Sequence, residues 1–185
     1  MSFSLEKGET LGLVGESGSG KTTVGRCLIR LLEPTSGQIW LDGIDIPSMK
    51  ERRFRPMRAK VQIVFQEPYD AMNPRMTIGS IIREPLRLTD LSSADKTNRV
   101  LDLASQVYLE PDDLLKYPHE LSAGALQRAG VARAMSTSPE LIVLDEPTSF
   151  LDPSVRADIV ELLMGLQEKA GVSYVFISHD LTTVQ

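Results

Sequence analysis

Cysteine and a surplus of basic side chains are what this 185-residue chain most clearly lacks. Its one cysteine, Cys27, cannot form a disulfide within the chain, so we expect a small buried apolar side chain in a reducing compartment rather than a catalytic thiol. The formal net charge of -5 argues against nonspecific nucleic-acid binding, which normally leaves a basic footprint. The length and the hydrophobic content of 42% are those of one ordinary globular domain.

Long apolar segments are also absent. No stretch approaches the ~20 apolar residues of a membrane-spanning helix, and residues 1–7 contain neither a basic leader nor an apolar signal core. We therefore expect a cytosolic protein that reaches a membrane only through a partner. No heptad repeat is long enough for a coiled coil. No Asn-Lys-x-Asp motif is present to recognise guanine, which disfavours a GTPase.

The most informative stretch that is present covers residues 15–22, Gly-Glu-Ser-Gly-Ser-Gly-Lys-Thr, between an apolar run and a helix expected at 22–32. The spacing G-x-x-x-x-G-K-T predicts a P-loop, in which glycines let backbone N–H groups turn onto phosphates and the helix N-terminus adds its dipole. A plain Gly/Ser turn is the weaker interpretation. We expect Lys21 to reach the β- and γ-phosphates and the Thr22 hydroxyl to complete a Mg²⁺ shell. The predicted nucleotide contacts are Gly15, Glu16, Ser17, Gly18, Ser19, Gly20, Lys21, Thr22 and Thr23.

The segments around the P-loop predict a mixture of strands and turns. Residues 3–14 indicate the end of one strand, a turn, and a buried strand that leads into the P-loop. The dipeptide Asp42-Gly43, favoured in tight hairpins, lies between two short apolar segments at 38–41 and 44–46. A strand, a helix and a hairpin in this order are expected for a mixed α/β domain.

A basic segment follows at residues 50–60. We interpret it as a solvated connecting segment, since a run of charge is usually an exposed surface, and keep a site for nucleic acid or anionic headgroups as the alternative. Only one acidic residue, Glu51, accompanies its basic residues, which are Lys50, Arg52, Arg53, Arg55, Arg58 and Lys60.

The middle of the chain predicts helices without strands. A buried strand at 61–65 ends at Gln66 and leads into an irregular stretch. Helices are then expected at 78–86, 94–107 and 122–135, the second with an apolar face formed by Val100, Leu101, Leu103, Ala104 and Val107. We therefore divide the chain into a P-loop core, residues 1–66 and 138–185, and an inserted helical subdomain, residues 67–137.

The last part of the chain returns to alternating strands and helices. The apolar run 141–144 meets Asp145-Glu146, a helix is expected at 153–169 with proline in its first turn, and a strand at 174–177 leads to His179. Such alternation predicts a parallel sheet whose ligands bind beyond the carboxyl ends of the strands. The predicted fold is an α/β P-loop NTPase with a mixed, mainly parallel sheet, an N-terminal antiparallel β element and the inserted α-helical subdomain.

With these motifs in order, the whole chain resembles the nucleotide-binding subunit of an ATP-binding-cassette (ABC) transporter. The P-loop is similar to the family's Walker A motif, Gln66 to its Q-loop, 121–125 to the signature motif, 141–145 to Walker B, 149–152 to the D-loop, and His179 to the switch histidine. Residues 69–75, 117–120, 146–149 and 176–180 resemble the importers of oligopeptides, dipeptides and nickel.

The resemblance assigns roles to single residues. It implies that Asp145, with Thr22 and Gln66, holds Mg²⁺, that Glu146 is the catalytic base, and that His179 contacts the γ-phosphate. Gln66 would also contact the attacking water, and both Gln66 and Lys21 count with Glu146 and His179 as catalytic residues. It also implies that Ser122, Gly124 and Asp152 contact nucleotide across a head-to-tail dimer. Taken alone, the Asp-Glu pair could merely cap a turn, and a lone histidine, such as His119, would more often be structural.

The sequence departs from the family pattern in the signature motif and at the two ends of the chain. Ala123 replaces the first glycine of the signature and Ala125 its glutamine. We expect both changes to affect the catalytic surface and to weaken an ATP-closed dimer, through crowding by the Ala123 methyl group or backbone strain if its φ is positive. Phe3 is a poor match for the family's adenine-stacking aromatic residue, and the end soon after His179 suggests a fragment or a trimmed chain.

The expected function is therefore an ATPase, with ATP and Mg²⁺ as cofactors, that powers a membrane importer of peptides or a related small solute. Its partners would be a second ATPase subunit, permease subunits and, indirectly, an extracytoplasmic solute-binding protein, at the cytoplasmic face of the membrane. No nucleic acid is expected. One alternative is an ABC-type ATPase that acts on nucleic acid, with residues 50–60 as its footprint. The other is a weakly hydrolytic regulatory subunit of a heterodimer.

Overall fold

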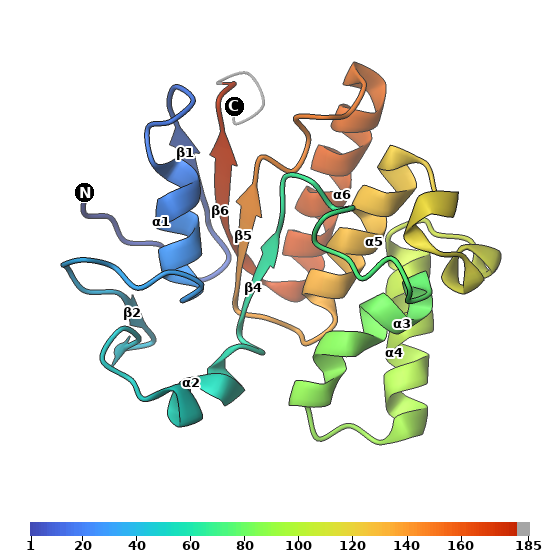
Figure 1. The fold of residues 1–185 in the computed structure, drawn as a ribbon, viewed down its shortest axis with the longest axis horizontal. Helices are drawn as coiled ribbons and strands as arrows, with labels where there is room; N and C mark the ends of the chain where they lie inside the picture. The colour runs from blue at the N-terminus through green and yellow to red at the C-terminus, as the bar shows by residue number, and fades with distance from the viewer. Residues whose placement is uncertain (181–185) are drawn as a thin grey trace.

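A computed structural model describes residues 1–180 of the chain and has a four-stranded parallel sheet at its centre (Figure 1). The strands are β1 (Thr10–Val14), β4 (Val61–Val64), β5 (Leu141–Asp145) and β6 (Ser173–Ser178), in the order β1-β6-β5-β4. Every neighbouring pair is parallel, so the carboxyl ends of all four strands meet at one edge of the sheet. The predicted α/β class is confirmed.

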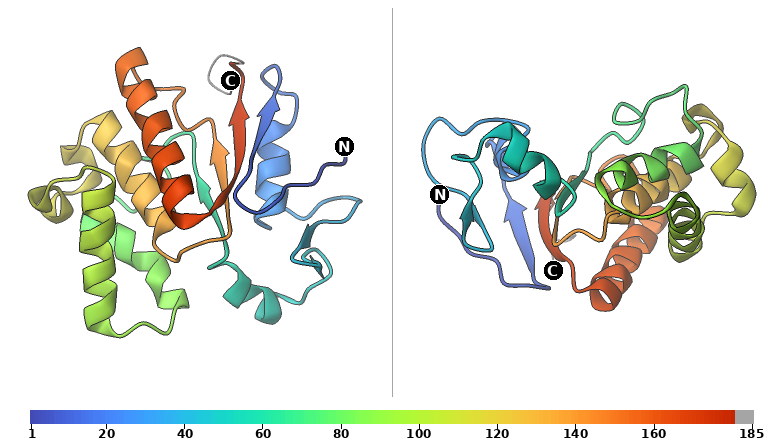
Figure 2. Two further views of the ribbon diagram at one scale, coloured as in Figure 1. Left: turned by 180° about the vertical axis from the view of Figure 1, so that it is seen from behind. Right: turned by 90° about the horizontal axis from the view of Figure 1, so that it is seen from below.

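Helices cover both faces of this sheet (Figures 1 and 2). Helix α1 (Lys21–Leu28) lies on one side, and α5 (Ala123–Met135) and α6 (Pro153–Ala170) lie on the other. Successive residues of the central strands alternate between the two cores: Val143 packs with the α1 side, whereas Leu144 packs with the side of α5 and α6. Burial on both faces explains the continuous apolar runs 141–144 in β5 and 174–177 in β6.

The predicted hairpin is confirmed as a separate two-stranded antiparallel sheet. Strands β2 (Trp40–Leu41) and β3 (Ile44–Asp45) pair across the Asp42-Gly43 turn. Both turn residues have positive φ, 49° for Asp42 and 74° for Gly43, as a tight hairpin turn of the type I′ class requires. The antiparallel element therefore stands beside the parallel sheet instead of extending it.

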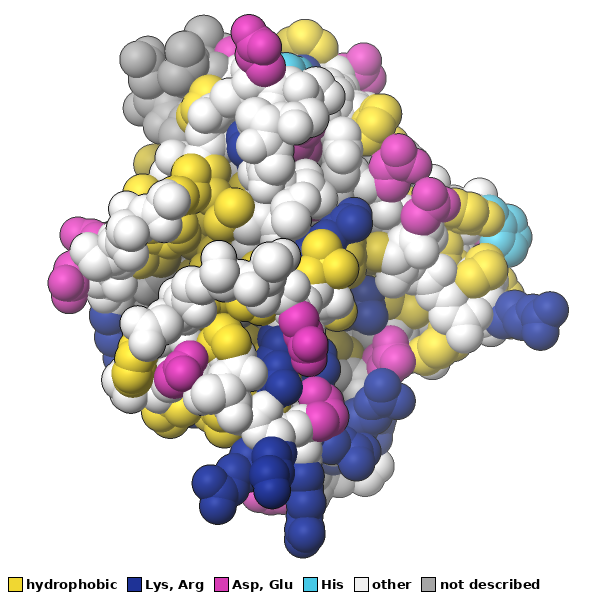
Figure 3. Space-filling view, turned by 60° about the vertical axis from the view of Figure 1, so that its left-hand side comes forward, with side chains coloured by type: hydrophobic (Ala, Val, Ile, Leu, Met, Phe, Trp, Pro, Cys, Tyr) yellow, Lys and Arg dark blue, Asp and Glu magenta, His cyan; other side chains and the backbone are white. Residues whose placement is uncertain are grey.

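The basic segment is more ordered than the predicted connecting segment. It contains helix α2 (Glu51–Met57), whose Phe54 is fully buried beneath two guanidinium groups. Those of Arg30 and Arg58 each lie 5.0 Å from the centre of the Phe54 ring. One apolar residue thus anchors the helix while its other basic residues stay exposed. Figure 3 shows Lys and Arg side chains gathered at the lower end of one face.

The region between β4 and β5 is helical, as predicted. It contains α3 (Ile78–Arg83), α4 (Ser93–Gln106), three 3₁₀ turns and α5. The 3₁₀ turns are η1 (Glu84–Leu88), η2 (Pro111–Leu115) and η3 (Pro118–Glu120). Leu101 does not belong to the apolar face of α4, because half of its surface is exposed. The buried residues of this region form one continuous cluster with β4, β5 and α6, and its division from the P-loop core stays a prediction.

Three expectations near the N-terminus need correction. Helix α1 ends at Leu28, not 32, because Arg30 adopts a left-handed φ of 53° and the N–H of Leu31 turns back to the Arg26 carbonyl. Strand β1 is mostly exposed instead of buried, since among residues 1–180 it pairs only with β6 and lies at the edge of the sheet. Cys27 is free but only half-buried.

Within residues 1–180, no helix is long and apolar enough to cross a bilayer.

A close approach between α1 and the sheet yields a stability prediction. A Cβ atom added to Gly25 would lie 2.8 Å from Ile177 Cδ1 and 2.9 Å from Val143 Cγ1. We expect Gly25→Ala to lower the free energy of unfolding by roughly 1–3 kcal/mol, because overpacking outweighs the helix propensity gained. The matched control is Gly165→Ala in α6, where no atom lies within 4 Å, and it should stabilise by about 0.5–1 kcal/mol. Urea unfolding of both variants measures the difference; equal effects would contradict the packing argument.

Candidate functional site

The P-loop occupies the turn between β1 and α1, at the carboxyl edge of the sheet. Gly18 and Gly20 have φ values of 80° and 92°, a region in which a side chain is strained, so glycine is required at both positions. The Lys21 ammonium folds back over the loop and donates to the carbonyl oxygens of Gly15 and Glu16, both at 2.8 Å. A third contact, to Ser19 Oγ, measures 3.3 Å. The loop carbonyls therefore hold the Lys21 ammonium at the N-terminal end of α1, where an anion would bind.

The end of β5 brings a carboxylate to the first turn of α1. Thr22 Oγ1 donates to Asp145 Oδ1 at 2.9 Å, which joins two residues 123 positions apart in the chain. Asp145 is only 3% exposed. Burial raises the pKa of the Asp145 carboxyl group above its ordinary value, and the Thr22 hydrogen bond and the nearby Arg26 charge oppose that increase.

The Thr22–Asp145 pair fits the oxygen chemistry of Mg²⁺. A hydroxyl and a carboxylate are hard donors, and Mg²⁺ sites that involve phosphates usually take only one or two protein ligands. Within residues 1–180 there is no cluster of three or more His, Cys, Asp or Glu side chains suited to a metal ion. The residues present thus fit a magnesium ion shared with a phosphate rather than a metal held by the protein alone.

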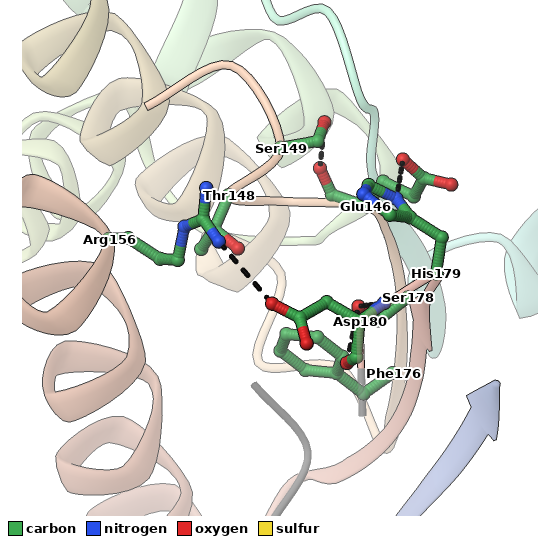
Figure 4. Close-up of a pocket in the computed structure, with 8 residues that line it drawn as sticks. All are labelled: Glu146, Thr148, Ser149, Arg156, Phe176, Ser178, His179 and Asp180. Carbon is green, nitrogen blue, oxygen red and sulfur yellow. Dashed lines mark hydrogen bonds and ion pairs between the residues drawn. The ribbon is translucent and has the colours of Figure 1, made fainter. Parts of the chain in front are cut away.

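Glu146 is the point at which three segments of the chain meet. Its Oε2 accepts a hydrogen bond from Gln66 Nε2 at 3.2 Å. The same oxygen lies 3.0 Å from His179 Nδ1 (Figure 4). Its backbone has a φ of 47°, uncommon for a residue with a side chain, and is held there by two contacts. The Glu146 N–H donates to the Ile177 carbonyl at 3.0 Å, and its own carbonyl accepts from Ser149 Oγ at 3.1 Å.

An open cleft of ≈ 460 Å³ lies between the P-loop and Glu146. It is lined by Ser17, Gly18, Gly20, Lys21, Thr22, Thr23, Gln66, Glu146 and His179. All nine were predicted as site residues, and the structure brings them together. Four further predicted residues contact the lining of the cleft without belonging to it. Lys21 contacts Gly15, Glu16 and Ser19, and Thr22 donates a hydrogen bond to Asp145.

The remaining predicted contacts, Ser122, Gly124 and Asp152, do not line this cleft. Ser122 is exposed and caps α5, where its Oγ accepts the Ala125 N–H at 3.3 Å. Gly124 packs so closely that an added Cβ would lie 2.8 Å from Val155 Cγ1. Asp152 precedes α6 and is exposed.

The two signature alanines differ from the expectation. Ala123 is exposed in the first turn of α5 and has no positive φ, so the strain considered for it is absent. Ala125 is only 7% exposed and belongs to the buried cluster that joins the helical region to β4, β5 and α6. The expectation that both changes lie at the catalytic surface is therefore wrong for Ala125, because position 125 of the helix faces inward.

A phosphate-binding loop between a parallel strand and a helix, with an acidic strand end facing it, defines a P-loop nucleotide-binding protein. Residues 1–149 match the family described as ABC transporter. The chain belongs to this ABC transporter family.

Several curated relatives cover the whole chain. A putative peptide import ATP-binding protein of Brucella ovis is 47% identical over 186 residues, and the oligopeptide transport ATP-binding protein AppF of Bacillus subtilis is 48% identical over 187. The glutathione import ATP-binding protein GsiA of Salmonella paratyphi A is 46% identical. The chain spans 59%, 57% and 30% of these three proteins, respectively.

Solved structures give the same fold. The dimeric, post-hydrolysis ATP-binding cassette MJ0796, bound to ADP and Pi, matches with a TM-score of 0.87 and 29% identity, over 98% of this chain and 79% of that one. The cassette cbiO1 of Clostridium perfringens matches with a TM-score of 0.88 and 26% identity, over 100% of this chain and 72% of that one.

The buried Asp145 predicts a stability effect that depends on pH. A carboxyl group whose pKa is raised on folding binds its proton more tightly in the folded state. Its contribution to stability is therefore full at low pH and is lost as the pH rises from about 3.8, the ordinary value, through the raised pKa. At pH 7 the charged Asp145 thus costs stability.

We expect Asp145→Asn to raise Tm at pH 7 in the absence of nucleotide, since asparagine still accepts the Thr22 hydrogen bond and carries no charge. A gain of ~1 kcal/mol corresponds to roughly 2–4 °C for a chain of this size. The gain should shrink as the pH is lowered to 4. Thermal melts across this range, with the exposed Asp158→Asn as control, measure it. A variant less stable than the parent at pH 7 would refute the burial argument.

Proposed function

We propose that this chain is the ATP-binding and ATP-hydrolysing subunit that powers an ABC-type importer of peptides or a related small solute. The observation that carries the proposal is the position of Glu146, directly across the cleft from the P-loop, with Gln66 and His179 both bonded to one of its oxygens. The names of its peptide-importing relatives support the choice of cargo.

Nucleotide binding follows from the P-loop. The glycine-rich backbone and the N-terminus of α1 receive the phosphates, and the Lys21 ammonium moves from two loop carbonyls and Ser19 Oγ to the β- and γ-phosphates. Thr22 and Asp145, with Gln66 in the wall of the cleft, would hold Mg²⁺. When bound, this ion neutralises charge on the β- and γ-phosphates. The remaining proposed nucleotide contacts of the P-loop are Glu16, Ser17, Ser19 and Thr23.

Hydrolysis requires a base that can accept a proton from the attacking water. Glu146 is well placed because its strained backbone is fixed between β6 and Ser149, which holds the carboxylate at the edge of the cleft. Gln66 and His179 both contact its Oε2. A γ-phosphate in the cleft competes for the His179 imidazole, and water competes for the Gln66 amide. Nucleotide binding therefore frees the carboxylate to act as a general base.

The site is completed by a second subunit in this proposal. Ser122 and Asp152 are exposed and lie outside the chain's own cleft, as groups that serve a partner's cleft would. The solved relative MJ0796 is dimeric. Permease subunits, and indirectly a solute-binding protein, would be the other partners, at the cytoplasmic face of the membrane. Residues 67–137 would act as the helical subdomain that carries Ser122 and Gly124.

The test compares two glutamate variants. We expect Glu146→Gln to lower kcat for ATP hydrolysis by about 10²–10⁴-fold, the typical contribution of a general base, while nucleotide affinity stays within a few fold. The exposed Glu168→Gln in α6 is the matched control and should hydrolyse ATP at the parent rate. Phosphate release and nucleotide titration give both quantities. A Glu146→Gln variant that turns over ATP normally would rule out the proposed role.

The signature alanines give a separate prediction. Only Ala123 is exposed, so only its methyl group can crowd a partner's γ-phosphate. We expect Ala123→Gly to raise ATP turnover about fivefold, which corresponds to ~1 kcal/mol at the transition state. We expect Ala125→Gln, which alters a buried position, to give no gain. ATPase assays at concentrations that support dimers measure this. Unchanged turnover in Ala123→Gly, in a preparation shown to dimerise, would contradict the crowding hypothesis.

A further inference from the structure

Arg156, on helix α6, makes an ion pair that none of the motifs above includes. Its Nη1 lies 3.6 Å from Oδ2 of Asp180, the residue after His179 (Figure 4). The pair joins the start of α6 to the end of β6 across 24 positions of the chain. About a third of each side chain is exposed, so water screens the attraction only in part.

The position of Arg156 is unfavourable without such a partner. It is the fourth residue of α6, close to the positive end of the helix dipole, and the one acidic residue at this end of the helix is the exposed N-cap residue Asp152, since the first turn contains none. Its Nε is buried and has no hydrogen-bond partner among residues 1–180. A cation in this place loses stability on its own helix. The loss is offset if the guanidinium acts on the Asp180 carboxylate.

Two hydrogen bonds between Ser178 and Asp180 enclose His179. Ser178 Oγ accepts the Asp180 N–H at 2.9 Å and donates to the Asp180 carbonyl at 3.0 Å, which closes a three-residue turn with the histidine at its centre. The His179 side chain itself is 55% exposed, so packing alone does not fix it. An ion pair at the Asp180 side chain therefore restrains the 178–180 turn and, with it, the imidazole of His179, whose Nδ1 lies 3.0 Å from Glu146 Oε2.

The space enclosed by these groups is too small to be a separate binding site. The void between Arg156, Asp180, Glu146 and His179 measures ≈ 10 Å³, about the size of one water-sized sphere. These charged groups therefore act on one another rather than on a ligand of their own. Figure 4 shows the sequence of contacts, from Arg156 to Asp180 on one side and from His179 to Glu146 on the other.

We propose that Arg156 is a positioning residue that, through its ion pair with Asp180, holds the 178–180 turn so that His179 faces Glu146 and the phosphate cleft. The inference rests on the proposed ATPase function. It predicts that loss of the guanidinium lowers turnover but leaves nucleotide binding intact, because the P-loop lies on β1 and α1 and does not contact Arg156. The first turn of α6 thus contributes to the mechanism through Arg156, which contacts neither the nucleotide nor the attacking water.

The kinetic test uses Arg156→Gln and its conservative counterpart Arg156→Lys. A partly exposed ion pair contributes at most about 1 kcal/mol, so we expect Arg156→Gln to lower kcat roughly two- to fivefold with KM for ATP unchanged. Arg156→Lys, which keeps the charge, and the exchange Arg156→Asp with Asp180→Arg should both recover part of the loss. The matched control is Arg87→Gln, which breaks another exposed ion pair, Arg87–Glu84 at 3.4 Å, and should leave kcat unchanged.

A second measurement does not depend on turnover. The chain has two histidines, so selective labelling gives two imidazole signals in an NMR spectrum, and His119 on η3 serves as the internal reference. We expect Arg156→Gln to shift and broaden the His179 signal and to leave the His119 signal in place. Assignment follows from a His119→Gln variant of the parent.

The two measurements separate failure of the inference from failure of the proposed function. An unperturbed His179 signal in Arg156→Gln, or a normal kcat in that variant, overturns the positioning role while ATPase function stands. A folded parent with no ATP hydrolysis overturns the proposed function, and the His179 signal still decides whether Arg156 orients the imidazole.

Discussion

Burial of strand β5 on both faces is the constraint on which the rest of the molecule depends. Ile142, Val143 and Leu144 are fully buried between α1 on one side and α5 and α6 on the other. Such a strand must end abruptly when its residues become charged, and here the change occurs at Asp145 and Glu146. The two carboxylates therefore stand at the sheet edge, where the P-loop after β1 and His179 after β6 also arrive. The hydrophobic effect is not directional, but burial of the apolar part of β5 thereby determines where its polar end, and with it the site, lies.

The sequence predicts well those features whose causes are local. The apolar runs predicted β5 and β6 to within a residue at each end, Asp42-Gly43 predicted the hairpin turn, and Ser122 marked the start of α5. It does less well where distant neighbours decide. The exposure of Leu101 and the anchoring of α2 by Phe54 depend on what packs beside them, and the pattern of one segment carries no such information.

The candidate site shows the same division. Parallel strands that end at one edge predict that Lys21, Gln66, Glu146 and His179 meet, and the cleft contains all four. Their bonding could not be predicted, because it depends on the left-handed φ of Glu146, which turns its carboxylate toward Gln66 and His179 together. Arg156 was missed because its partner lies far along the chain. The only sequence signal was a basic residue near the start of a helix, where its charge is unfavourable.

The methyl group of Ala123 has two opposing effects. Alanine in place of glycine favours the helical state by about 1 kcal/mol, so it stiffens the first turn of α5, whose cap is the exposed Ser122. A stiffer turn keeps its unpaired N–H groups and positive dipole end directed outward, which favours an approaching anion. The same methyl group adds bulk to the surface that the anion must approach. The balance is decided by distance, because the dipole acts beyond van der Waals contact and steric crowding does not. A partner phosphate that contacts Ser122 and Gly124, as proposed, reaches the backbone N–H groups, so crowding by the Ala123 methyl group outweighs the gain from the dipole.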